Sequence, residues 1–194
     1  MAKLVLVTGG ARSGKSAFAE AALWDKPDVC YLATGLSRQD DPDWQERVRL
    51  HQQRRPEAWV THEQYAGLGD WLRGASHRNY LLDCVTMLTT NVLFDTVAAQ
   101  WPDKVTLDET CFLSRTEQAQ LLEQLLSEWQ SIIASLRDKD GEVYIVTNEI
   151  GLGIVPDTPL GRYFRDVLGQ VNQFLAKEAS EVYLVICGLA QRLK

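Results

Sequence analysis

The stretch Gly9-Gly10-Ala11-Arg12-Ser13-Gly14-Lys15-Ser16 decides the fold, because it matches the phosphate-loop pattern of glycine, four residues, then glycine-lysine-serine. An apolar strand pattern precedes it at residues 3–8, and a helical pattern follows it at residues 16–23. Glycines let the backbone curl so that its N–H groups point at phosphate oxygens, and the helix adds its positive N-terminal end. The loop therefore predicts nucleoside triphosphate binding, with Lys15 reaching the β- and γ-phosphates and Ser16 ligating Mg²⁺.

The pattern of apolar residues around the loop predicts an α/β fold. Continuous runs of valine, leucine, isoleucine and tyrosine are typical of parallel strands buried on both faces. Such runs cover residues 3–8, 29–34, 59–61, 80–83, 142–147 and 181–186. Helical patterns separate them; one begins with a capping box at Ser114 and Glu117, and another begins at Thr158 with proline in its first turn. This alternation predicts a single domain over residues 1–194, a mostly parallel phosphate-loop NTPase-type sheet flanked by helices.

Residues 95–112 are the least regular part of the chain, with Pro102 and scattered charges. We expect a loop or an insertion there, before the helix that begins at Ser114. A domain boundary is the alternative, but no glycine- and serine-rich linker accompanies it.

Composition and charge exclude several classes of protein. The chain has 194 residues and a net charge of 20 − 26 = −6, which does not favour binding to nucleic acid or to an anionic membrane surface. Apolar residues make up 45% of it, as in an ordinary globular domain, yet no run approaches the roughly 20 apolar residues of a membrane helix. The four cysteines lie far apart and form no metal or redox motif, so we expect a reduced, cytoplasmic protein.

A phosphate loop usually works with a carboxylate at the end of another strand, which helps to hold Mg²⁺. Asp83 directly follows the apolar run at residues 80–82 and is the first candidate, as a metal ligand together with Ser16. Glu149 follows the run at residues 142–147 and is a second candidate. A turn residue or a helix cap is the alternative role for Asp83.

The segment from Glu46 to Arg55 departs from the acidic background. It holds four arginines and one glutamate, so its local charge is +4 − 1 = +3, and it contains His51. A helix ending before Pro56 would place Arg47, His51 and Arg54 or Arg55 on one face. One interpretation is a solvated basic surface. The other is a site for a phosphate-rich ligand, in which His51 positions the ligand or attacks an α-phosphate and carries the nucleotide.

A block near residue 150 adds a specific resemblance to these two features. It reads Thr147-Asn148-Glu149-Ile150-Gly151-Leu152-Gly153-Ile154-Val155-Pro156, and further matching segments run from the phosphate loop to residues 169–173. The chain resembles the bifunctional adenosylcobinamide kinase / adenosylcobinamide-phosphate guanylyltransferases of cobalamin biosynthesis. The resemblance implies that adenosylcobinamide is phosphorylated by ATP or GTP. GMP is then transferred from GTP to that phosphate, which gives adenosylcobinamide-GDP and pyrophosphate.

The resemblance also implies roles for individual residues. His51 aligns with the histidine that carries GMP covalently in the family, and Lys15 is the catalytic lysine of the loop. The implied nucleotide contacts are Gly9, Gly10, Ala11, Arg12, Ser13, Gly14, Lys15, Ser16, Ala33, Thr34, Gly35, Gln52, Gln53, Arg54, Arg55, Glu63 and Asp83. The implied cofactor is Mg²⁺ on Ser16 and Asp83, and the implied assembly is a homotrimer.

Two other functions are consistent with the phosphate loop alone. One is a small-molecule kinase without the guanylyl step. The other is a nucleotide-dependent binding or switch protein, although the chain lacks the Asn-Lys-x-Asp signature with which regulatory GTPases read guanine.

Overall fold

The computed structural model describes residues 1–35, 45, 46, 49, 52–104 and 112–194. Seven strands form one sheet in the order β3-β2-β4-β5-β1-β6-β7. The strands are β1 (Lys3–Thr8), β2 (Val29–Ala33), β3 (Val60–Glu63), β4 (Asn79–Asp83), β5 (Glu142–Val146), β6 (Glu181–Ile186) and β7 (Leu189–Arg192). The helices are α1 (Lys15–Leu23), α3 (Leu68–Gly74), α4 (Val85–Gln100), the short 3-10 helix η1 (Pro102–Lys104), α5 (Arg115–Arg137) and α6 (Pro159–Glu178).

The sheet is parallel throughout, except that β7 runs antiparallel to β6. β1 lies inside the sheet, between β5 and β6. Because parallel strands end at the same edge, the loops that follow β1, β2, β4 and β5 meet at one edge of the sheet. Ligands of open α/β sheets bind at this edge. The predicted α/β class with a mostly parallel sheet is confirmed.

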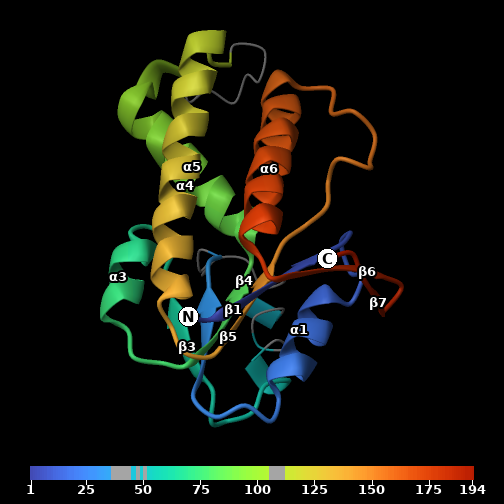
Figure 1. The fold of residues 1–194 in the computed structure, drawn as a ribbon. Coiled ribbons are helices and arrows are strands. Elements are labelled where there is room, and N and C mark those ends of the chain that lie inside the picture. The colour runs from blue at the N-terminus through green and yellow to red at the C-terminus, as the bar shows by residue number, and fades with distance from the viewer. Residues whose placement is uncertain (36–44, 47–48, 50–51, 105–111) are drawn as a thin grey trace.

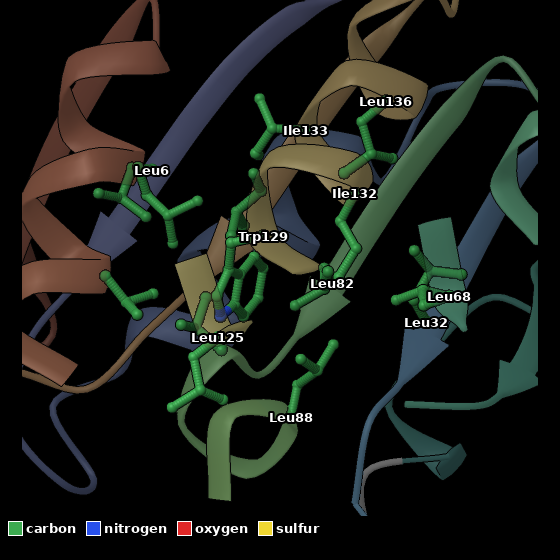
Figure 2. Packing of buried hydrophobic residues seen from close by; sticks show 14 of the residues in the cluster. Leu6, Leu32, Leu68, Leu82, Leu88, Leu125, Trp129, Ile132, Ile133 and Leu136 are labelled. Atoms are coloured by element: carbon green, nitrogen blue, oxygen red, sulfur yellow. The ribbon is translucent and has the colours of Figure 1, made fainter. Parts of the chain in front are cut away.

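Strand side chains alternate between two apolar layers. On one face, Leu6, Leu32 and Leu82 belong to one apolar layer with side chains of α3, α4, α5 and α6, among them the buried Trp129 (Figure 2). The Trp129 indole N–H donates to Thr89 Oγ1 at 3.1 Å, so the polar atom of this buried ring has a partner. The opposite face carries the second layer, in which strand side chains pack against α1. Figure 1 shows α1 and the group of α4, α5 and α6 on opposite sides of β1.

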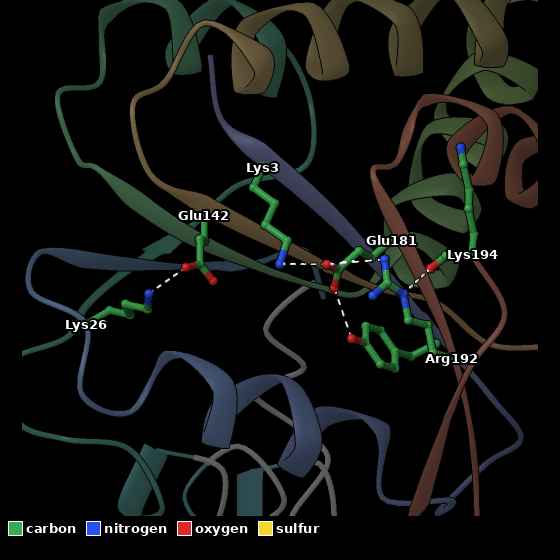
Figure 3. Close-up of polar contacts among 7 residues, drawn as sticks. Lys3, Lys26, Glu142, Glu181, Arg192 and Lys194 are labelled. Atoms are coloured by element: carbon green, nitrogen blue, oxygen red, sulfur yellow. Dashed lines mark hydrogen bonds and ion pairs between the residues drawn. The ribbon is translucent and has the colours of Figure 1, made fainter.

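Polar contacts fix the C-terminal strands beside β1. Glu181 at the start of β6 pairs with Lys3 at 2.8 Å and with Arg192 at 3.5 Å, and it accepts a hydrogen bond from Tyr183 (Figure 3). Lys194 Nζ donates to three carbonyl oxygens at the C-terminal end of α6, where a cation opposes the negative end of the helix dipole. These contacts fix the end of the β6–β7 hairpin that lies opposite its turn.

The helix starts agree with the sequence. Ser114 and Glu117 form the predicted capping box, and Thr158 accepts a hydrogen bond from the Gly161 N–H at the start of α6. No helix in the described part of the chain is long and apolar enough to span a membrane.

Two predictions of secondary structure were wrong. Residues 95–100 belong to α4 rather than to a loop, because Val97 is buried in the core and Asp95 accepts a hydrogen bond from Tyr65. The remainder of the irregular stretch, residues 105–111, lies outside the described residues. No strand was predicted at β7, because its four residues are exposed and lack the apolar run on which the other strands were predicted.

Candidate nucleotide-binding site

The phosphate loop leaves β1 and leads into α1. Gly14 caps α1 with φ of 97°, a conformation that glycine adopts at no steric cost. A Cβ on Gly9 would lie 2.4 Å from the carbonyl oxygen of Val185, so the backbone passes too close to β6 for a side chain. Gly188, in the turn between β6 and β7, donates its N–H to the Ser13 carbonyl oxygen at 2.8 Å. Backbone contacts with β6 and this turn therefore fix the loop.

Lys15 lies inside the loop. Its Nζ donates to the Gly10 carbonyl oxygen at 2.9 Å, and the residue is buried. Burial lowers the pKa of Lys15, while the nearby charge of Asp83 raises it. The ammonium group is thus held among the loop residues, in a partly desolvated place where its charge acts strongly on a bound phosphate.

The strand register brings three predicted nucleotide contacts to the same edge. Glu63, Ala33, Asp83, Val146 and Val7 occupy one row across the sheet, each paired with the next. This row ends on β1 two residues before the loop begins. Val146 on β5 is the immediate neighbour of this β1 position, whereas Asp83, Ala33 and Glu63 lie progressively further along the same edge.

Asp83 has a defined partner at this edge. Tyr31, which is buried on β2, donates its hydroxyl to Asp83 Oδ2 at 2.9 Å. Glu149, the alternative candidate for the metal ligand, is arranged differently: its Oε1 accepts the Gly151 N–H at 2.5 Å, and its own N–H donates to the Gly9 carbonyl oxygen at 3.0 Å. Glu149 thus fastens the loop after β5 to the phosphate loop, whereas the charge of Asp83 acts on the Lys15 ammonium group and raises its pKa.

Thr34 holds the ends of β2 and β4 together. Its hydroxyl donates to the Cys84 carbonyl oxygen at 2.7 Å and accepts from the Cys84 N–H at 2.9 Å. The buried Asn91 donates to the Thr34 carbonyl oxygen at 2.9 Å. Because Thr34 is fully buried, the structure places its side chain in contacts within the protein.

Arg54 and Arg55 both face Glu20 on α1. The closest nitrogen–oxygen distances to the carboxylate are 3.5 Å from Arg54 and 3.8 Å from Arg55. The Arg55 guanidinium also lies over the Tyr31 ring, 3.3 Å from its centre. The Arg55 side chain is only 7% exposed, so its charge is directed at Glu20 and Tyr31 rather than at solvent.

The remaining residues of the basic segment are partly described by the structure. The Arg49 guanidinium donates two hydrogen bonds to the Glu46 carboxylate, from Nη2 at 2.6 Å and from Nε at 2.7 Å. Gln52 and Gln53 are exposed and helical, as predicted, whereas His51 lies outside the described residues. The three described arginines between residues 46 and 55 are therefore all paired with carboxylates, and the excess positive charge is largely offset in place.

Among the implied contacts of the phosphate loop, Gly10, Ala11 and Arg12 are exposed, and Ser13, Gly14 and Ser16 are half-buried. Gly35, which follows Thr34, is also half-buried. The loop thus offers an accessible backbone beside a buried lysine. The described part of the chain contains no cluster of three or more histidine, cysteine or acidic residues that could hold a metal by themselves.

Sequence reasoning missed Glu20, Tyr31 and Gly188. Glu20 carried one signal, since it is the only charged residue within the run Ala17–Leu23 that follows the loop. Tyr31 was interpreted as part of an apolar strand and of a segment that resembles the family, with no role of its own, and nothing near Gly188 marked its approach to the loop.

Comparison with known proteins identifies the family. The family model described as cobinamide kinase / cobinamide phosphate guanyltransferase matches residues 5–193. The chain belongs to this family. It is 41% identical over 194 residues to the bifunctional adenosylcobalamin biosynthesis protein CobU of Escherichia coli, covering 98% of this chain and 99% of the relative. It is 38% identical to the Salmonella typhimurium protein of the same name, with the same coverage. The predicted kinase and guanylyltransferase activities are those of the family and are confirmed.

A solved structure supports the fold alone. An ATPase from a bacterial type III secretion system aligns with a TM-score of 0.54 at 11% identity, covering 99% of this chain and 58% of that one. At such low identity, the similarity shows the phosphate-loop NTPase architecture and says nothing about the substrate.

Proposed function

We propose that the phosphate loop and the adjoining edge of the sheet form one nucleotide site that serves both reactions of the family in turn. One electrostatic interaction and two direct contacts support this proposal. Lys15 interacts electrostatically with Asp83, Asp83 accepts the Tyr31 hydroxyl, and the Tyr31 ring lies under Arg55. Arg55 follows His51 by four residues in the sequence. These interactions therefore link the loop lysine to the segment that carries the proposed nucleophile.

In the phosphoryl transfer, the loop binds and orients the triphosphate, and Lys15 offsets the charge that develops on the phosphate oxygens. The hydroxyl oxygen at the end of the aminopropanol arm of adenosylcobinamide forms a bond to the γ-phosphorus. The bond from that phosphorus to the bridging oxygen breaks, the nucleoside diphosphate leaves, and the hydroxyl proton passes to water. Positioning and charge supply most of the rate in reactions of this kind.

Ser16 and Asp83 would hold Mg²⁺ at this site. The two residues offer a hydroxyl in the first turn of α1 and a carboxylate at the end of β4, and oxygen donors of this kind suit a small hard cation that keeps several waters. The absence of a closed acidic cluster among the described residues fits a cation held by few protein ligands. When bound, Mg²⁺ supplies positive charge to the triphosphate oxygens.

In the guanylyl transfer, a neutral His51 ring nitrogen attacks the α-phosphorus of GTP and pyrophosphate leaves. An oxygen of the phosphorylated cobinamide then attacks the same phosphorus, the nitrogen–phosphorus bond breaks, and adenosylcobinamide-GDP forms. The imidazole must be neutral to act as the nucleophile, and a neighbouring positive charge favours that form.

Incubation with GTP labelled at the α-phosphate tests this proposal. We expect label on the protein that is stable in alkali, labile in acid and lost in His51→Ala, as for a phosphorus–nitrogen bond. Phosphorylation of adenosylcobinamide by an intact protein that takes up no label would support a kinase without the guanylyl step. Nucleotide hydrolysis without transfer to cobinamide would support a switch protein instead.

The assembly and location are also proposed. The resemblance implies a homotrimer, and the exposed apolar side chains Leu152, Ile154, Ile186 and Leu189 are consistent with further contacts. Light scattering on the purified protein gives the mass that tests it. We place both reactions in the cytoplasm, where nucleoside triphosphates are available.

A further inference from the structure

Glu20 is a buried carboxylate on α1, the helix that begins at the loop lysine. Its side chain is only 6% exposed, and it faces both arginines of the segment that follows His51. Burial raises the pKa of Glu20, while the charges of Arg54 and Arg55 lower it. A carboxylate in such a desolvated place needs positive charge beside it to remain ionised. The ion pair is therefore part of how the segment and the helix fit together.

The contact between Glu20 and Arg55 is electrostatic rather than a close hydrogen bond. Glu20 Oε1 and Arg55 Nε are 3.8 Å apart, and neither atom has a hydrogen-bond partner among the described residues. On its other side, the Arg55 guanidinium lies 3.3 Å from the centre of the Tyr31 ring. A desolvated guanidinium is attracted to the negative face of an aromatic ring. Glu20 and Tyr31 thus both contact Arg55, whose Nη1 also donates to Thr61 Oγ1 at 3.5 Å.

We propose that Glu20 and Tyr31 form a socket for Arg55, and that Glu20 is a positioning residue for the guanylyl transfer. Arg55 follows His51 by four residues, so fixing Arg55 against α1 limits how far the nucleophile can lie from the helix that begins with Lys15 and Ser16. The inference rests on the proposed role of His51. It gives Glu20 a function that touches neither nucleotide nor cobinamide.

The socket predicts a difference between the two reactions. The phosphate loop is held by β6 and by Gly188, through contacts that do not involve Glu20. Phosphoryl transfer depends on that loop, whereas guanylyl transfer additionally requires the His51 segment to be in place. Loss of the Glu20 charge should therefore slow the second reaction much more than the first.

Glu20→Gln tests this difference, because it keeps the size of the side chain and removes its charge. We expect the rate of covalent labelling from GTP labelled at the α-phosphate to fall by about 10- to 100-fold, since small misplacements of a reacting group cost rates of this order. Phosphorylation of adenosylcobinamide should change by less than about threefold. Asp25→Asn, at an exposed site just after α1, is the matched control and should leave both rates unchanged.

Each outcome decides between the socket and its alternatives. Equal losses in both reactions, together with a lowered melting temperature, would show that Glu20 only stabilises the fold and would overturn the inference. Labelling of Glu20→Gln at the wild-type rate would overturn it as well. If the wild-type protein itself takes up no label, the proposed role of His51 fails instead, and the two failures are thus distinguishable.

Glu20→Asp keeps the inference testable if the glutamine variant does not fold. It retains the charge and shortens its reach, so we expect an intermediate loss of labelling with phosphorylation preserved. A double variant adds a second readout. If Glu20 acts through Arg55, the double variant of Glu20→Gln and Arg55→Gln should label no more slowly than Arg55→Gln alone, whereas independent roles would give multiplied losses.

Discussion

The phosphate loop and the segment of residues 52–55 are held in place by different means. The loop is fixed by backbone groups, through the close approach of Gly9 to β6 and the hydrogen bond from Gly188 to Ser13. The segment is fixed by side chains, through the contacts of Arg54 and Arg55 with Glu20 and Tyr31. A loop fixed by its backbone tolerates many changes of side chain, whereas a segment fixed by three or four side chains does not.

This difference has a consequence for the two activities. The part of the site that phosphoryl transfer needs is preorganised by glycine geometry and by the sheet. In the proposed division of roles, the part that guanylyl transfer adds depends on one buried charge and one aromatic ring. We therefore expect the two reactions to separate under mutation, and the guanylyl transfer to be lost more easily.

Lys15→Ala should give the largest effect and should remove both reactions together. The lysine supplies the positive charge closest to the phosphates, and loss of such a group costs roughly 100- to 1,000-fold in rate. Steady-state phosphorylation of adenosylcobinamide and covalent labelling from GTP measure the two losses. A Lys15→Ala protein that still phosphorylated adenosylcobinamide at the wild-type rate would contradict the role of this residue.

Gly9→Ala should damage the loop through its backbone. The new Cβ would lie 2.4 Å from the Val185 carbonyl oxygen, so either the loop or β6 must move. Overpacking of this kind costs about 1–3 kcal/mol of stability, which thermal unfolding measures, and nucleotide affinity should fall with it. Gly10→Ala is the control for the stability measurement alone, because a Cβ at Gly10 meets nothing within 4 Å. Equal effects of the two substitutions would show that the approach to β6 does not constrain the loop.

The phosphate loop and its sheet could be predicted from the sequence because both depend on patterns among neighbouring residues. The glycine–lysine–serine spacing and the apolar runs depend on neighbouring residues, and so do the caps at Ser114 and Thr158. β7 was not predicted because an exposed edge strand needs no apolar run. The C-terminal end of α4 was not predicted because the burial of Val97 depends on packing against the other helices.

The contacts of the arginine segment could not be predicted for a different reason. Glu20 and Arg55 are distant in sequence, and their meeting depends on how the segment of residues 52–55 packs beside α1. Sequence suggested instead an excess of positive charge open to a triphosphate. The structure shows that Arg49, Arg54 and Arg55 each have a carboxylate beside them, which local charge counting cannot reveal.

Tyr31→Phe should separate the two contacts that Tyr31 makes. It removes the hydroxyl that donates to Asp83 and keeps the ring under Arg55. Loss of a buried hydrogen bond to a carboxylate costs about 1–3 kcal/mol, so the melting temperature should fall. Covalent labelling should nevertheless survive better than in Tyr31→Leu, which also loses the stacking on Arg55. Equal labelling by the two variants would show that the ring does not hold the segment.

Arg49→Ala should give the smallest effect, although Arg49 belongs to the same basic segment as Arg55. Its partner, Glu46, is a close neighbour on the same helical turn, and both side chains are half exposed. The hydrogen bond from Arg49 lowers the pKa of Glu46, but an exposed pair of this kind contributes little to stability because water screens it. We expect labelling from GTP within about twofold of the wild-type rate.

The contrast between Arg49→Ala and Arg55→Ala is the sharpest test of the comparison, because it holds residue type and segment constant. If positive charge alone recruited the triphosphate, both substitutions would slow labelling to a similar extent and added salt would weaken both. If docking on α1 is what matters, only Arg55→Ala should be slow, and salt should change the difference little because the Arg55 pair is buried. Labelling rates of the two variants at low and high salt therefore decide whether the segment acts through its charge or through its attachment.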